Sequence, residues 1–289
     1  MAIPFEFGYE KPATIADALH LLDKWGRNAR ILAGGTDLAN ELKQGFRVPE
    51  LLVDIKGLDA LEKIKVLDDA LHIGALVTFD MVRNSQLVRD HAYILYEAAG
   101  LVASSGVRNR ATVVGNICSA VACMDSAAPL LVHDAVVHTA SLEGEREVPV
   151  QDWFVDNRKT LVGEKEMVSH VSIPLPKIKY AGAYQKMMRY TGEDLAAANV
   201  GVLLMEDGAC RVAFGSVGPI PRRSPEIESF LEKNGVNARN IEQAKEMIGG
   251  IISPITDVRA TREYRMHMTK VMFVRAMHAA VERLKKQKI

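Results

Sequence analysis

The opening residues have the spacing of a short amphipathic helix. Apolar side chains recur every three or four positions from Ile15 to Leu22, which matches the 3.6-residue period of a helix. Thr14 stands at the N-cap position, Asp17 occupies the third helical position of a capping box, and Gly26 follows the last apolar residue. The pattern therefore predicts a helix that begins after Thr14 and ends before Gly26.

Short apolar runs predict buried strands in the first 180 residues. These runs cover residues 29–32, 51–55, 71–76, 135–140 and 167–173. After the third run, Thr78 is a candidate cap for a short helix, and the pattern over about residues 92–103 indicates a longer helix. The first quarter of the chain thus has a βα-like pattern with short connections.

The pattern changes after Pro174-Leu175-Pro176, which makes residues 174–180 the best candidate for a domain boundary. Three later runs predict strands at residues 183–188, 200–205 and 211–217, and helices are expected around 224–233 and 238–248. The last predicted helix covers about residues 262–285. We expect it to pack on the C-terminal sheet through a stripe of apolar residues, namely Tyr264, Met268, Val271, Val274, Met277, Val281 and Leu284.

Composition and charge exclude several classes of protein. Of the 289 residues, 48% are apolar and 25% are charged, as in soluble globular proteins, and the length suggests two domains. Lys plus Arg and Asp plus Glu both number 36, so no net charge attracts nucleic acid. The first residues lack a signal-peptide pattern, and no apolar run approaches the roughly 18 residues of a membrane-spanning helix. We expect a cytoplasmic protein without nucleic-acid binding or membrane insertion.

The cysteines and histidines form no recognisable metal or disulfide pattern. Cys118, Cys123 and Cys210 are odd in number and contain no CxxC pair, so we expect buried, small apolar side chains and no disulfide, iron–sulfur or zinc site. His138 has no second histidine or carboxylate at ligand spacing in the sequence. No nucleophile or acid–base pair stands out either, so we predict neither catalytic residues nor metal ligands in this chain.

A glycine-bearing turn after the first predicted strand is the first candidate binding site. This turn, the first loop, reads Leu32-Ala33-Gly34-Gly35-Thr36-Asp37-Leu38. Adjacent glycines let consecutive backbone N–H groups point into one concavity, and the Thr36 hydroxyl adds a donor, so the loop suits a phosphate. A tight strand-to-helix turn without a ligand explains the same residues equally well. The GxGxxG and GxxxxGK[ST] patterns of other nucleotide-binding loops are absent.

A second segment about eighty residues later offers similar chemistry. This second loop reads Thr112-Val113-Val114-Gly115-Asn116, and Asp125 follows it nine residues beyond Asn116. Backbone donors and a side-chain amide suit the other half of a pyrophosphate, while a carboxylate suits sugar hydroxyls. A simple turn and a surface or helix-capping aspartate are the alternatives. The two loops together favour a dinucleotide more than either loop does alone.

Several ordered motifs resemble those of one known family. They are the opening helix, the first loop, Val53-Asp54-Ile55, Ile73-Gly74-Ala75, Val107-Arg108-Asn109, Gly115-Asn116-Ile117, Asp125, Tyr184-Gln185-Lys186 and Glu263-Tyr264-Arg265. Their order and spacing resemble the FAD-binding medium subunits of the xanthine dehydrogenase and carbon monoxide dehydrogenase group of molybdenum hydroxylases. The resemblance covers nearly the whole chain.

The resemblance implies an α+β fold in two domains. Residues 1–176 would form a vanillyl-alcohol-oxidase-like (PCMH-type) FAD-binding domain with lobes of about 1–57 and 58–176. Residues 177–289 would form a C-terminal domain with a three-stranded antiparallel sheet and a helix bundle. The family also implies an electron-transferring oxidoreductase subunit that binds FAD. Its partners would be a small [2Fe-2S] subunit and a large molybdopterin subunit, in a dimer of heterotrimers, with NAD⁺ or another molecule as acceptor.

The resemblance also implies roles for individual residues. Both loops would contact the pyrophosphate of FAD, and Asp125 would bind its sugar-type hydroxyls. Val102 and Val168 match positions that line the cofactor in the family. Lys186 would lie close to the flavin ring, where a cation stabilises the anionic reduced flavin. On the residues alone, an exposed strand lysine is the alternative for Lys186.

One departure from the family pattern lies in the second loop. The family usually reads T-I-G-G-N, and Val114 replaces the first of the two glycines. A β-branched residue disfavours positive φ and adds bulk where the backbone meets phosphate. We therefore expect this loop to lie further from FAD or to bind it less tightly.

Two other functions fit parts of the pattern. The first is a self-contained FAD-dependent reductase or oxidase of the same FAD-domain superfamily, which would turn over substrate without partners. The second is a non-catalytic phosphate-binding module whose two loops hold a nucleotide or nothing. Flavin absorbance of the purified protein distinguishes the second from the others.

Overall fold

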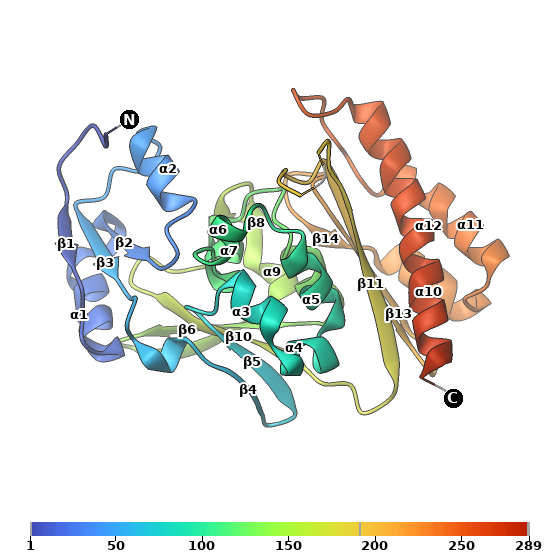
Figure 1. Cartoon of the computed structure of the whole chain (residues 1–289), viewed down its shortest axis with the longest axis horizontal. Coiled ribbons are helices and arrows are strands. Elements are labelled where there is room, and N and C mark those ends of the chain that lie inside the picture. Colours follow the sequence, from blue (N-terminus) through green and yellow to red (C-terminus); the bar gives the residue numbers. More distant parts are fainter. Residues whose placement is uncertain (1, 191, 288–289) are drawn as a thin grey trace.

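The structure is a computed structural model that describes residues 2–190 and 192–287. Figure 1 shows three regions along the long axis of the molecule: a small first lobe, a second lobe and a C-terminal region. The first lobe holds a parallel sheet in the order β1-β3-β2. Its elements are β1 (Gly8–Glu10), α1 (Ile15–Trp25), the 3-10 helix η1 (Gly26–Asn28), β2 (Ala29–Leu32), α2 (Leu38–Lys43) and β3 (Leu51–Asp54).

The predicted first helix is α1, and its capping box is present. The Asp17 N–H donates to Thr14 Oγ1 at 3.1 Å, and the Thr14 N–H donates to Asp17 Oδ2 at 3.1 Å. The helix buries Ala18, Leu19 and Leu22, as the apolar spacing predicts. The structure therefore confirms this helix from its cap to its buried face.

The second lobe holds a five-stranded antiparallel sheet in the order β4-β5-β10-β6-β7. In Figure 1, helices α3 to α7 lie between the first lobe and β11. The elements are η2 (Asp59–Leu61), β4 (Ile64–Leu67), β5 (Ala70–Gly74), α3 (Phe79–Asn84), α4 (Gln86–His91), α5 (Tyr93–Gly100), α6 (Ser105–Arg108), α7 (Val113–Ser119), α8 (Ala127–Val132), β6 (Val136–Ser141), β7 (Gly144–Pro149), α9 (Val150–Trp153), β8 (Phe154–Asp156), β9 (Lys159–Thr160) and β10 (Met167–Pro174). Strands β8 and β9 pair with each other.

The two edge strands of this sheet were not predicted. Strands β4 and β7 are mostly exposed, so neither carries the apolar run that marks a buried strand. The βα-like interpretation of the first quarter is also incomplete, because the run at residues 71–76 joins the antiparallel sheet as β5 and leaves the parallel sheet with three strands.

Three histidines stack on one face of the five-stranded sheet. The His138 and His170 rings are 4.0 Å apart with planes 9° from parallel, and the His72 and His170 rings are 5.0 Å apart. The sequence did not indicate this cluster, because its members come from β5, β6 and β10, which pair only in the folded sheet. Burial and the neighbouring rings lower the pKa of His170 to about 4.

The C-terminal region holds an antiparallel sheet in the order β11-β12-β13-β14, covered by helices. Its elements are β11 (Tyr180–Met187), β12 (Ala198–Met205), β13 (Cys210–Gly215), β14 (Arg222–Arg223), α10 (Pro225–Asn234), α11 (Ala238–Met247), η3 (Ile248–Gly250) and α12 (Arg262–Lys286). The expected three strands are present, and the two-residue β14 adds a fourth. Two residues are too few to leave a pattern in the sequence.

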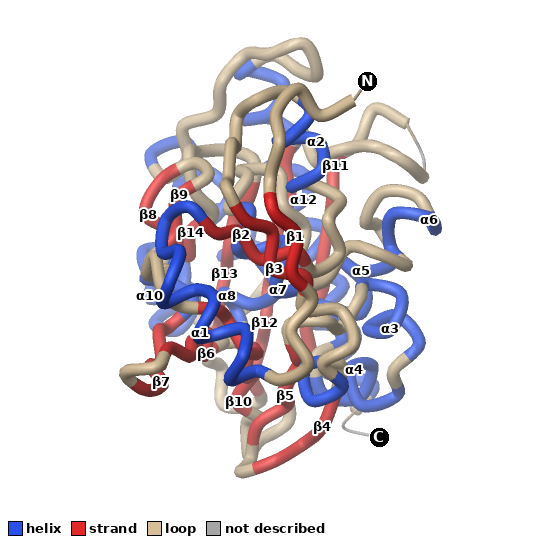
Figure 2. The backbone as a smooth tube through the Cα atoms, turned by 90° about the vertical axis from the view of Figure 1, so that its left-hand side faces the viewer, coloured by secondary structure: helices blue, strands red, loops and turns tan. Residues whose placement is uncertain are grey.

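This sheet is covered on both faces. Helix α12 packs on β11 and β12, while α5 packs on β11 and α8 packs on β12 and β13 from the second lobe. Every residue of β12 is consequently buried. The close approach of α5 to β11 depends on Gly182 of that strand, where a Cβ atom would lie 2.3 Å from Ile94 Cδ1 of α5. Figure 2 shows the same regions from the side of the first lobe.

The predicted stripe of the last helix is confirmed in part, and α12 packs on the sheet as expected. Met277 is buried, and Val274, Val281 and Leu284 are partly buried against the C-terminal core. The buried residues of α12 are Arg265, Thr269, Met272, Phe273, Ala276, Met277 and Ala280, and only Met277 belongs to the predicted stripe. Small residues let the helix approach the sheet, and Arg265 is buried because it donates to Ser216 O at 3.3 Å and to Asp257 Oδ1 at 2.6 Å. Tyr264, at the start of the predicted stripe, is exposed.

Candidate functional site

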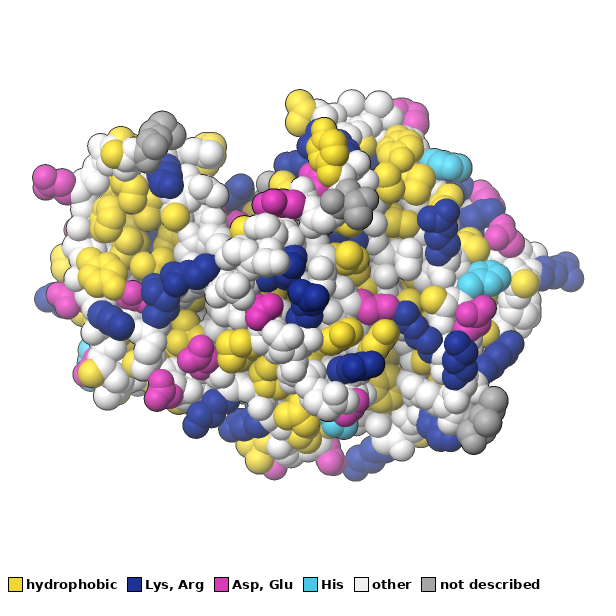
Figure 3. Space-filling model, in the orientation of Figure 1, with side chains coloured by type: hydrophobic (Ala, Val, Ile, Leu, Met, Phe, Trp, Pro, Cys, Tyr) yellow, Lys and Arg dark blue, Asp and Glu magenta, His cyan; other side chains and the backbone are white. Residues whose placement is uncertain are grey.

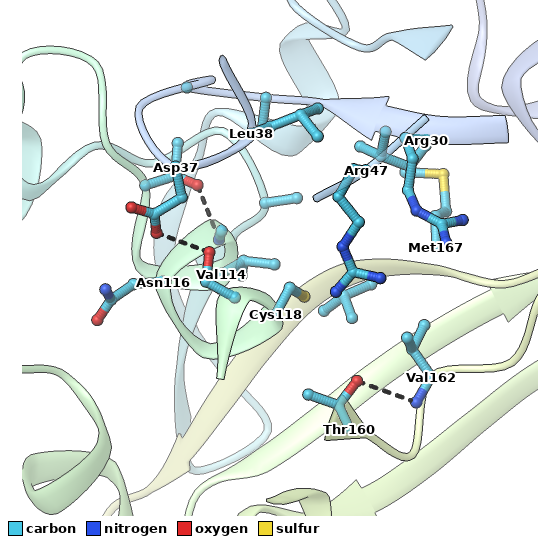
Figure 4. Close-up of a pocket in the computed structure, with 18 of the residues that line it drawn as sticks. Arg30, Asp37, Leu38, Arg47, Val114, Asn116, Cys118, Thr160, Val162 and Met167 are labelled. Atoms are coloured by element: carbon cyan, nitrogen blue, oxygen red, sulfur yellow. Dashed lines mark hydrogen bonds between the residues drawn. The ribbon is translucent and has the colours of Figure 1, made fainter. Parts of the chain in front are cut away.

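A cavity of about 520 Å³ opens between the first and second lobes. Its volume lies within the range of small-molecule and cofactor sites. Figure 3 shows the surface hollowed between the first lobe and the rest of the molecule. In Figure 4, Asp37 and Leu38 of the first lobe lie across from Val114 and Asn116 of α7. The cavity therefore lies between the two candidate loops.

Both predicted loops contribute to the wall of this cavity. The lining residues that the sequence predicted are Ala33, Gly34, Gly35, Thr36, Asp37, Leu38, Thr112, Val114, Gly115, Asn116 and Val168. The other predicted residues, Leu32, Val102, Val113, Asp125 and Lys186, are not among the described residues that line it. Leu32 is the last residue of β2, and Val102 and Val113 are buried in the core.

The first loop contains a row of backbone donors that have no backbone acceptor in the part of the chain that the structure describes. Within the described residues, none of the N–H groups of residues 34–37 donates to a backbone carbonyl. Gly35 has a φ of +77°, and a Cβ atom on Gly34 would lie 1.9 Å from Arg110 O. Position 35 therefore requires glycine for its backbone conformation, and position 34 requires glycine because the backbone of Arg110 lies too close for a side chain. Such a row of donors at a cavity wall suits an anion.

The second loop is the first turn of α7. Thr112 caps the helix, with its Oγ1 accepting from the Gly115 N–H at 2.9 Å, and the Val113 N–H donates to Val77 O at 3.2 Å. The Val114 N–H has no acceptor among the described residues, as expected for the first turn of a helix. Val114 has no conformational strain, because helical φ is negative and Val114 is not among the residues with positive φ. Weaker FAD binding by this loop stays a prediction. Its side chain packs into the core.

A side-chain hydrogen bond joins the first loop to α7, the helix that begins with the second loop. The Ser119 hydroxyl of α7 donates to Asp37 Oδ2 at 2.7 Å. Asn116 Oδ1 accepts from the Ser126 hydroxyl at 2.7 Å, which fixes the amide at the cavity wall. Asp37 Oδ2 therefore helps to hold the first loop against α7, and the donors available to a ligand include backbone N–H groups, the Thr36 hydroxyl and the Asn116 amide nitrogen.

Asp125 and Lys186 form a buried network behind the wall. Asp125 Oδ2 accepts from Lys186 Nζ at 2.8 Å and Asp125 Oδ1 accepts from the Tyr184 hydroxyl at 2.7 Å, while Lys186 Nζ also donates to Leu101 O at 2.9 Å. The Lys186 side chain has no exposed surface. Burial raises the pKa of Asp125, although Lys186 and Tyr184 act in the opposite direction. The alternative of an exposed strand lysine is wrong.

Several charged residues of the cavity wall were missed by the sequence interpretation. Arg30 and Arg47 of the first lobe extend toward the cavity in Figure 4. Burial and the nearby Arg47 lower the pKa of Arg30. Glu41 of α2 and Arg158 of the β8–β9 turn also line the cavity. No local motif marks these residues, since they come together only when the lobes do.

The cysteines differ from expectation at one position. Cys210 is buried and Cys123 is partly buried, but Cys118 is exposed and lines the cavity. Position 118 follows Ile117, which takes the buried position of α7, so Cys118 lies on the cavity side of the helix, where burial of the thiol raises its pKa to about 12. Residues 2–190 and 192–287 contain no group of three or more His, Cys, Asp or Glu side chains arranged to hold a metal ion. No helix in these residues is long and apolar enough to cross a membrane.

Comparison with known sequences identifies two family models along the chain. One, described as "FAD binding domain in molybdopterin dehydrogenase", matches residues 5–176, and the other, "CO dehydrogenase flavoprotein C-terminal domain", matches residues 182–280. The chain is 30% identical to the carbon monoxide dehydrogenase medium chain of Afipia carboxidovorans, over 98% of this chain and 99% of that one. It is also 30% identical to the xanthine dehydrogenase FAD-binding subunit of Escherichia coli O157:H7, over 96% and 97% of the two chains.

Solved structures show the same relationship. A chain of carbon monoxide dehydrogenase from Hydrogenophaga pseudoflava superposes with a TM-score of 0.92 at 30% identity, covering 98% of this chain and 99% of that chain. A chain of quinoline 2-oxidoreductase from Pseudomonas putida 86 superposes with a TM-score of 0.90 at 26% identity, covering 98% and 99% of the two chains. The chain therefore belongs to the family of FAD-binding medium subunits of molybdopterin dehydrogenases and is an oxidoreductase component.

Proposed function

We propose that this chain holds one FAD in the cavity between the lobes and transfers electrons within a molybdenum hydroxylase. The observation that carries the proposal is the row of N–H groups at residues 34–37, which have no backbone acceptor among the described residues and belong to the same cavity wall as the first turn of α7. A diphosphate supplies the anionic oxygens that such donors need. The residues present thus fit the cofactor that the family binds.

We propose specific roles for the residues of the wall. The first loop, Thr112, Val114, Gly115 and Asn116 would hold the diphosphate, and Val168 would contact the adenosine half. Val168, Met167 and Val162 all line the cavity, and their apolar side chains suit an aromatic base. Leu32, Val102 and Val113 would shape the wall from behind. The redox chemistry belongs to the flavin, and this chain binds, orients and shields it.

Asp125 and Lys186 are proposed to act near the flavin end of the cofactor. Asp125 accepts from Lys186 and Tyr184, and Lys186 also donates to Leu101 O, so each group is held in place by two partners. Each Asp125 oxygen keeps an acceptor site beyond these bonds, and through it Asp125 would accept a hydrogen bond from a ribityl hydroxyl. Lys186 would act through its buried positive charge, which favours the anionic reduced flavin.

We propose that the division into domains follows the two lobes and the C-terminal region. Residues 1–176, with lobes of about 1–57 and 58–176, would form the vanillyl-alcohol-oxidase-like FAD-binding domain, and residues 177–289 the C-terminal domain. Electrons would come from a small [2Fe-2S] subunit and originate at a large molybdopterin subunit, in a cytoplasmic dimer of heterotrimers. NAD⁺ or another acceptor would then reoxidise the flavin.

Purification with and without the neighbouring open reading frames tests this proposal. We expect the isolated chain to carry about one FAD per polypeptide, with flavin absorbance and no substrate turnover of its own. Co-expression should recover a complex that contains iron, molybdenum and FAD. A folded chain that cannot be reconstituted with FAD overturns the proposal, and turnover by the isolated chain favours a self-contained reductase or oxidase.

A further inference from the structure

Glu41 lies between two arginines from different parts of the cavity wall. Its Oε2 atom is 3.4 Å from Arg47 Nε, and its Oε1 atom is bonded to Arg158 Nη1. The Glu41 side chain is only 13% exposed, whereas the Arg158 and Arg47 side chains are 43% and 36% exposed. Glu41 and Arg47 belong to the first lobe and Arg158 to the second, so these three residues, the Glu41 bridge, join the lobes across the cavity.

The backbone at Arg158 is held in a conformation that a non-glycine residue rarely adopts. Its φ is +62°, in the left-handed region. The Arg158 N–H donates to Ala120 O at 2.8 Å, directly after α7, which ties the β8–β9 turn to the helix that begins with the second loop. A side chain kept at a strained position is a reason to look for a function there. Here the strained turn aims the guanidinium at Glu41.

From this arrangement we infer that the Glu41 bridge closes the cavity over the bound dinucleotide and slows its release. The inference rests on the proposed FAD site. Arg158 and Glu41 both line the cavity and come from opposite lobes, so a ligand that leaves between the lobes on their side of the cavity must separate them. The two guanidinium groups also place positive charge beside a ligand with an anionic diphosphate. The bridge is a positioning element and takes no part in the redox chemistry.

A second ion pair between the lobes provides a matched control. Lys165 Nζ is 2.7 Å from Asp23 Oδ1, with side chains 55% and 47% exposed. Neither residue is among the described residues that line the cavity. Lys165→Met therefore removes the same charge as Arg158→Gly and breaks a contact between the same lobes, but leaves the Glu41 bridge intact.

The test is the rate of FAD release from the full-length chain, followed by the rise of flavin fluorescence after dilution. Arg158→Gly should release FAD about tenfold faster than wild type, and Glu41→Gln should also accelerate release. Lys165→Met should release FAD at the wild-type rate. Because the bridge is ionic, added salt should accelerate release from wild type and have little effect on Arg158→Gly.

A readout without cofactor separates this role from a purely structural one. Glycine adopts a φ of +62° without strain, so apo Arg158→Gly should melt no lower than apo wild type. FAD release at the wild-type rate from both Arg158→Gly and Glu41→Gln overturns the inference while leaving the FAD site in place. Equal acceleration by Lys165→Met also overturns it, because any contact between the lobes would then serve. A wild-type chain that takes up no FAD overturns the proposed function itself.

Discussion

At the cavity wall, the N–H groups of residues 34–37 have no backbone acceptor within residues 2–190 and 192–287, whereas behind the wall both carboxylate oxygens of Asp125 are bonded to protein groups. Donors left free at an open surface are available to a ligand, and water satisfies them until one binds. A buried charge without a partner is costly, so the interior network must be complete in the protein itself. The donors at the wall are available to a ligand, whereas the buried network stabilises the fold. Substitutions at the wall should therefore mainly lower FAD binding, and substitutions in the network should mainly lower stability.

The largest effect on stability is expected in the buried network. Lys186→Met leaves the Asp125 carboxylate buried without its cation and should lower the free energy of unfolding by about 3–5 kcal/mol. Denaturant unfolding of the apo chain measures this loss. The double variant Lys186→Met with Asp125→Asn removes the uncompensated charge and should recover part of it. If Lys186→Met unfolds at the wild-type denaturant concentration, the network is not a structural element.

A smaller loss of stability, with a large loss of cofactor, is expected at the first loop. In Gly34→Ala the new Cβ atom meets Arg110 O, so the loop must move, at a cost of about 1–3 kcal/mol. The donors move with it, and FAD content should fall well below that of wild type. Gly106→Ala is the control, because a Cβ atom there meets no other group within 4 Å. If Gly34→Ala carries as much FAD as wild type, the first loop does not bind the cofactor.

His133 is buried away from the two loops, and neither of its ring nitrogens has a partner among the described residues. Burial lowers its pKa to about 4, below the value of about 6.5 in an unfolded chain. The unfolded state therefore binds a proton before the folded state does, and stability falls as the pH falls from 6.5 toward 4. His170, with a pKa also near 4, contributes in the same direction.

Replacing His133 by phenylalanine tests this contribution. Between pH 7 and pH 5, His133→Phe should lose about 2 kcal/mol less unfolding free energy than wild type. Thermal or denaturant unfolding of the apo chain at the two pH values gives the difference. Parallel pH profiles for the two proteins would show that His133 is protonated equally in both states. FAD binding at pH 7 should be unchanged, since the residue lines neither loop.

Among the residues of the two loops, Val114 is expected to have a small effect on FAD binding. Its side chain is buried in the core, but the group offered to the ligand is its backbone N–H. Val114→Ala keeps that N–H, so FAD affinity should change by less than about twofold while stability falls by about 1–2 kcal/mol. Isothermal titration and unfolding give the two numbers. A marked gain in affinity would support the original expectation that valine keeps FAD at a distance.

The sequence predicted those features whose cause is local. The α1 capping box needs only residues three apart, and the first loop follows its strand directly, so both could be identified from the order of residues. The stacked histidines and the Glu41 bridge could not, because Glu41 and Arg158 are 117 positions apart and no spacing rule connects them. The resemblance to a known family selected Asp125 and Lys186, but it gave no indication that they bond to each other.

The last helix and the edge strands show a second limit. Helix α12 has apolar residues on more than one face. Its buried face includes Ala276, Ala280 and the hydrogen-bonded Arg265, and the spacing of large apolar residues does not show that this face is the buried one. Strands β4 and β7 bury little surface. Tertiary packing and burial of polar groups determined these elements, and neither is visible in a single sequence.

Competition between ligands is the most direct measurement of the central claim, that backbone donors of the two loops hold the diphosphate. The apo chain is titrated with FAD in the presence of ADP, adenosine or riboflavin. We predict that ADP displaces FAD, and that adenosine and riboflavin, which lack phosphate, compete at least about a hundredfold less well. Competition by adenosine or riboflavin equal to that by ADP would contradict the account.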